Sequence, residues 1–165
     1  MFNALENVIH VLVVLNYKDL KMVPVLTHLL TYHNKNVLER YAMDYPNNHL
    51  SAEEAFQELM KFFWLSLKHK AEKLCAPTNA ELDFICGIHN EMEEIDDMWH
   101  TFLLFTKEYV AFCKEYLGVF FHHSPTTNEQ KIEVTHQDFA IDFSKFLSFV
   151  YDHLGEETVQ KWFGA

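Results

Sequence analysis

Glycine and proline are scarce in this chain of 165 residues, which contains four of each. Together they make up about 5% of the residues, where soluble proteins average roughly 12%. Propellers and turn-rich β-sandwiches need more of both, so the composition argues against these folds. The glycines are also too widely spaced to form GxGxxG or GxxxxGK(S/T). The sequence therefore argues against P-loop NTPases, kinases and Rossmann dehydrogenases.

Positive charge is the second scarcity. Twelve lysines and one arginine face 24 aspartates and glutamates, and the net charge at pH 7 is −11. Proteins that bind nucleic acid through its phosphates normally present a basic surface. We therefore expect no nucleic-acid partner of that kind, and we predict a protein partner with a basic surface.

Cysteines and long apolar runs are few as well. Cys75, Cys86 and Cys113 form an odd set without a CxxC pair, which indicates free thiols in a reducing compartment. We predict a cytoplasmic location, and delivery into a host cell stays open. No run of 18 apolar residues occurs, so no membrane span is expected. The apolar segment Val8–Leu15 is short and lacks a preceding Lys or Arg, unlike a signal peptide.

Apolar residues at helical spacing are what the chain has in abundance. Ser51–Glu54 reads as a capping box that opens a long helix, and residues 139–154 carry apolar residues three and four apart. Residues 3–15 fit a helix, although their β-branched residues leave a buried strand open, and residues 122–134 lack periodicity and are predicted to be a loop. We predict an all-α fold, a single compact helical domain over residues 1–165 with roughly six to eight helices.

The segment from residue 93 to residue 125 holds the densest group of unusual residues. Its characteristic positions are Ile95-Asp96, Trp99-His100-Thr101, Phe105-Thr106, Tyr109, Phe112-Cys113, Gly118, His122-His123 and Pro125. This pattern resembles the Trp-His core of the family found in plant glycine-rich domain proteins and in related bacterial proteins, although the plant proteins' glycine-rich tail is absent. The resemblance implies a domain type and transfers no reaction. Structural roles are predicted for Trp99, Thr106, Tyr109, Cys113 and Gly118.

Carboxylates and imidazoles in this segment have the spacing of metal ligands. Asp96 and His100 are four residues apart and Asp97 and His100 are three apart, so on a helix either carboxylate shares a face with the imidazole. His122 or His123 would complete a set of two histidines and one carboxylate. Such a set suits Fe²⁺, or Zn²⁺ with an open coordination position.

A straight helix over residues 95–117 would exclude this site. At 1.5 Å per residue, His100 would lie about 25 Å from the end of that helix. The few residues that follow could not bring His122 or His123 back across this distance. The metal hypothesis therefore requires a break near residues 105–107, where Thr106 is the candidate helix cap.

Core packing is the competing interpretation of the same residues. Trp99, Phe102 and Phe105 have the spacing of a buried helix face, and the acidic residues before them suit a helix N-terminus without any ligand. The leading prediction from sequence is a protein-interaction domain, such as a bacterial effector or accessory protein, with no cofactor and no assigned catalytic residue. The alternative is a metal-binding protein or metal-dependent enzyme that uses Zn or Fe at Asp96, His100 and the histidine pair.

Overall fold

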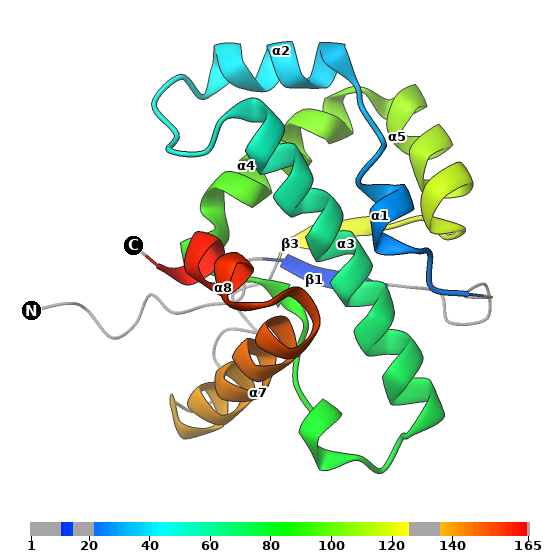
Figure 1. Cartoon of the computed structure of the whole chain (residues 1–165), viewed down its shortest axis with the longest axis vertical. Helices are drawn as coiled ribbons and strands as arrows, with labels where there is room; N and C mark the ends of the chain where they lie inside the picture. Colours follow the sequence, from blue (N-terminus) through cyan, green and yellow to red (C-terminus); the bar gives the residue numbers. More distant parts are fainter. Residues whose placement is uncertain (1–10, 15–21, 126–135, 165) are drawn as a thin grey trace, which may run out of the picture.

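The computed structural model describes residues 11–14, 22–125 and 136–164. Figure 1 shows an assembly of helices around one long central helix. The described part contains seven α-helices: α1 (Leu26–Leu29), α2 (Lys35–Asp44), α3 (Ala52–Cys75), α4 (Glu93–Leu104), α5 (Thr106–Phe112), α7 (His136–Leu154) and α8 (Glu156–Phe163). The predicted all-α fold is therefore confirmed. None of the described helices is both long enough and apolar enough to cross a bilayer.

Helix α3 lies at the centre of the core and begins at the predicted capping box. The Ser51 hydroxyl accepts a hydrogen bond from the backbone N–H of Glu54, whose carboxylate accepts one from the Ser51 N–H. Helices α1, α2, α4 and α7 all pack against α3. Because neighbours cover it on several sides, α3 is apolar over much more than a single stripe.

Aromatic rings fill the space between α3 and the segment after it. The fully buried Phe63 ring lies within 6.5 Å of the rings of Trp99, Tyr109, Phe112 and Phe121, measured between centroids. Offset and edge-to-face ring pairs of this kind add stability beyond the burial of their area. The candidate site lies directly against this aromatic layer.

A small antiparallel sheet accompanies the helices. Its strands are β1 (Val11–Val14), β2 (Gly87–Ile88) and β3 (His122–Pro125), in the order β2-β1-β3. Within residues 3–15 the described part is thus a strand, the alternative that the β-branched residues left open. The predicted loop over 122–134 is wrong for its first four residues, because β3 pairs with β1; residues 126–134 lie outside the described residues.

The three cysteines are free thiols. Cys75 is exposed, whereas Cys86 and Cys113 are buried. Burial raises the pKa of the Cys86 thiol to about 12 and also raises the pKa of Cys113. Since the thiolate is the reactive form, the two buried cysteines act as small apolar residues.

Glu58 joins the central helix to the C-terminal helix α8. Its carboxylate is 1% exposed, accepts hydrogen bonds from Trp162 Nε1 at 2.9 Å and Lys61 Nζ at 2.8 Å, and lies 3.7 Å from Lys161 Nζ. We expect Glu58→Gln to lower the free energy of unfolding by about 1–3 kcal/mol in urea denaturation, because it removes a buried charge that both lysines face. Glu157→Gln removes an exposed partner of Lys161 and serves as the control, with no measurable change. Equal losses in the two variants would contradict this role of Glu58.

Candidate metal centre

The chain turns sharply at Phe105. Helix α4 ends at Leu104 and α5 begins at Thr106, and Phe105 between them has φ −92° and ψ 63°, outside the helical region. A continuous helix over residues 95–117 is therefore ruled out, and the break lies where the metal hypothesis requires it. The predicted capping by Thr106 is wrong: Phe105 is the N-cap residue of α5, and no side chain makes a cap hydrogen bond there.

A glycine reverses the chain after α5. Helix α5 continues into a π-helical segment, Cys113–Leu117, which ends at Gly118. Gly118 has φ +72°, a left-handed conformation that strains other L-residues, as the sequence predicts for a helix-terminating glycine. The chain then enters β3, and this reversal carries its histidines back to α4.

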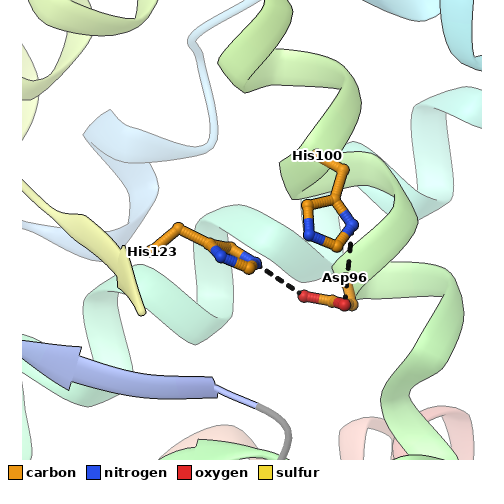
Figure 2. Close-up of side chains that lie close together, drawn as sticks. All are labelled: Asp96, His100 and His123. Carbon is orange, nitrogen blue, oxygen red and sulfur yellow. Dashed lines mark hydrogen bonds and ion pairs between the residues drawn. The ribbon is translucent and has the colours of Figure 1, made fainter. Parts of the chain in front are cut away.

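Asp96 and His100 from α4 converge with His123 from β3, as Figure 2 shows. Asp96 Oδ1 lies 3.0 Å from His123 Nε2, and Asp96 Oδ2 lies 3.6 Å from His100 Nδ1. One ligand atom from each residue can be chosen so that all three lie within 4.8 Å of one another. The His123 and Asp96 side chains are largely buried, whereas that of His100 is 49% exposed, so solvent reaches the cluster on the His100 side.

His122 lies away from this cluster. Successive residues of a strand point to opposite faces, so only one of two neighbouring histidines can face α4. His122 is exposed, its ring lies 4.7 Å from the ring of Phe120, and it lines a separate cavity together with Cys113. The structure thus brings three of the four predicted ligand residues together and leaves out His122.

Asp97 also stays outside the cluster. Its Oδ2 accepts a hydrogen bond from Asn48 Nδ2 at 3.0 Å, and the same amide group donates to the Tyr41 hydroxyl at 2.9 Å. Burial raises the pKa of the Asp97 carboxyl, and the nearby negative charges of Glu93 and Asp96 raise it further. Asp97 therefore connects α4 to the loop after α2.

Glu94 anchors the start of α4 to the same loop. Its carboxylate oxygens accept hydrogen bonds from the backbone N–H groups of His49 and Leu50, both at 2.7 Å. Burial alone would raise the pKa of Glu94, but these hydrogen bonds and the His49 side chain outweigh burial and lower it. The sequence gives no signal for this anchor, because its partners are 44 and 45 residues away.

Residues 26–144 match the family model described as UCP032817-like, and the chain belongs to that family. The matched region contains Asp96, His100 and His123. No curated protein and no solved structure shows a significant match to the chain. The resemblance of residues 93–125 to plant glycine-rich domain proteins stays an interpretation of that segment.

Proposed function

We propose that this member of the UCP032817-like family binds a divalent first-row transition metal, Zn²⁺ or Fe²⁺, through Asp96, His100 and His123. One observation carries the proposal: a carboxylate and two imidazoles converge, two of these groups from a helix and one from a strand. The chain reverses direction between these two elements to bring the three groups together. Mixed nitrogen and oxygen ligands favour these ions over Ca²⁺ and Mg²⁺, which prefer oxygen.

The distances in the cluster suit coordination after a small movement. In a tetrahedral site with bonds of about 2.0–2.2 Å, neighbouring ligand atoms lie about 3.3–3.6 Å apart. Asp96 Oδ1 lies 3.0 Å from His123 Nε2 and Asp96 Oδ2 lies 3.6 Å from His100 Nδ1, both close to this range, while the three ligand atoms together lie within 4.8 Å of one another. We expect the His100 side chain to make this movement. It is half-exposed and can rotate, whereas the His123 side chain is largely buried and cannot.

Three protein ligands leave at least one coordination position for water or for another molecule. That open position would lie on the exposed side of the cluster, next to His100. Structural zinc sites are instead closed by four protein ligands, so three ligands are typical of sites with an exchangeable ligand. When bound, such an ion supplies Lewis acidity and lowers the pKa of a coordinated water.

A calorimetric titration of the full chain, purified without a histidine tag, tests the proposal. We expect one Zn²⁺ per chain and a rise in melting temperature. At a free Zn²⁺ concentration of 100 times Kd, the stabilisation is about 2.7 kcal/mol. Mg²⁺ serves as the control and should give neither heat nor a shift. Absence of both signals with Zn²⁺ would overturn the proposal.

A protein-interaction domain is the second candidate function, and one observation favours it. A cavity of about 420 Å³ lies next to β3, and among the residues that line it are Val110 and Phe120, which are 51% and 42% exposed. Exposed apolar side chains that gather at one place are typical of contact surfaces. The net charge of −11 favours a basic partner. If the metal titration gives no signal, this becomes the leading function.

A further inference from the structure

We infer that Trp99 and Tyr109 form a buried relay that positions His123 for metal binding, an inference that rests on the proposed metal site. Trp99 Nε1 donates a hydrogen bond to the Tyr109 hydroxyl at 3.0 Å, and this hydroxyl donates to the Phe121 backbone carbonyl at 2.6 Å. All three residues are fully buried. Phe121 comes two residues before His123, so the relay fixes the chain where it enters β3.

Trp99 also contacts the proposed ligand directly. Its ring lies 4.6 Å from the ring of His123, at an interplanar angle of 74°. Trp99 thus limits the rotation of the imidazole on one side, while Asp96 holds Nε2 at 3.0 Å on the other. His123 is therefore held through its backbone by the relay and through its ring by Trp99. The half-exposed side chain of His100 can still rotate.

The break at Phe105 is what makes the relay possible. Trp99 and Tyr109 are ten residues apart, and on a continuous helix their Cα atoms would be separated by about 15 Å along the axis. The turn brings the Tyr109 hydroxyl within hydrogen-bond distance of Trp99 Nε1. Burial strongly raises the pKa of Tyr109, so its hydroxyl keeps the proton that it donates to Phe121. An indole N–H can only donate and a carbonyl oxygen can only accept, so the two hydrogen bonds run in a fixed direction from Trp99 through Tyr109 to the Phe121 carbonyl.

Tyr109→Phe separates positioning from packing, because it keeps the ring and removes the hydroxyl. The probe is Co²⁺, whose visible absorption reports both affinity and coordination geometry. We expect Tyr109→Phe to raise the Kd for Co²⁺ about 10- to 100-fold, the effect typical of residues that orient metal ligands, and to change the shape of the absorption bands. Trp99→Phe, which removes the indole donor, is the second variant and should give a change of the same direction.

Glu58→Gln is the matched control, since the Glu58 carboxylate bonds to Trp162, Lys61 and Lys161, none of which belongs to α4 or β3. It should leave the Kd for Co²⁺ and the band shape unchanged. If the wild-type chain binds no Co²⁺, the proposed metal site itself fails. If the wild type binds and Tyr109→Phe shows the same Kd and spectrum, the site stands and the relay is wrong. Equal losses of affinity in Tyr109→Phe and Glu58→Gln would likewise overturn the relay.

Discussion

We expect the variant His123→Gln to bind Zn²⁺ at least about 100-fold more weakly than the wild type and to retain its fold. The reason is that His123 supplies the ligand from β3 and makes the shortest contact with Asp96, so its loss leaves ligands from α4 alone. Glutamine has a similar length and stays polar, which limits the damage to packing. Calorimetric titration with Zn²⁺ measures the effect.

The neighbouring substitution His122→Gln is the matched control for this result. It makes the same chemical change one residue away, on the side of β3 where His122 lines the separate cavity. We expect no change in Zn²⁺ affinity. Loss of affinity in His122→Gln with wild-type binding in His123→Gln would reverse the assignment of the two histidines and contradict the structure.

We expect the variant Phe63→Ala to lose about 3–5 kcal/mol of unfolding free energy, the cost typical of removing a buried aromatic ring. Phe63 is fully buried in the aromatic layer beneath the site, where the surrounding rings cannot close the cavity by a simple rotamer change. Urea denaturation measures the loss. Phe120→Ala, at a ring that is 42% exposed, is the control and should cost less than about 1 kcal/mol. Similar losses of unfolding free energy in the two variants would contradict the assignment of Phe63 to the buried core.

Local features of the fold could be predicted from the sequence. The capping box at Ser51 and the reversal at Gly118 depend on residues within one turn of the helix, and both are present as expected. The pair Asp96 and His100 is likewise local, because a spacing of four on a helix places two side chains on one face. Features that depend only on residues close together in the sequence can therefore be predicted from the amino-acid pattern.

The choice between His122 and His123 could not be predicted in this way. It depends on the register of β3 against β1, in which His123 pairs with Val13 and His122 with Val14, more than 100 residues away. A shift of one residue would exchange the two histidines. A strand of four residues that includes two histidines and ends in proline also lacks the alternating apolar pattern that identifies strands.

The break at Phe105 is also a tertiary effect. No glycine or proline lies between Glu93 and Leu117, so the sequence shows a continuous helical pattern. The hydrogen bonds of Tyr109 with Trp99 and with the Phe121 carbonyl form only when the chain turns, and they favour the broken helix. Sequence reasoning could state the break as a condition for the metal site, but these contacts were needed to show it.

X-ray absorption at the zinc edge of the Zn²⁺-loaded full chain tests the central claim most directly. The proposed site predicts a first shell of nitrogen and oxygen atoms at about 2.0–2.2 Å, with outer-shell scattering from two imidazole rings. In His123→Gln loaded with excess Zn²⁺, the scattering should fall to that of one ring or fewer. A sulfur shell at about 2.3 Å, or a spectrum without imidazole scattering, would contradict a metal centre formed by Asp96, His100 and His123.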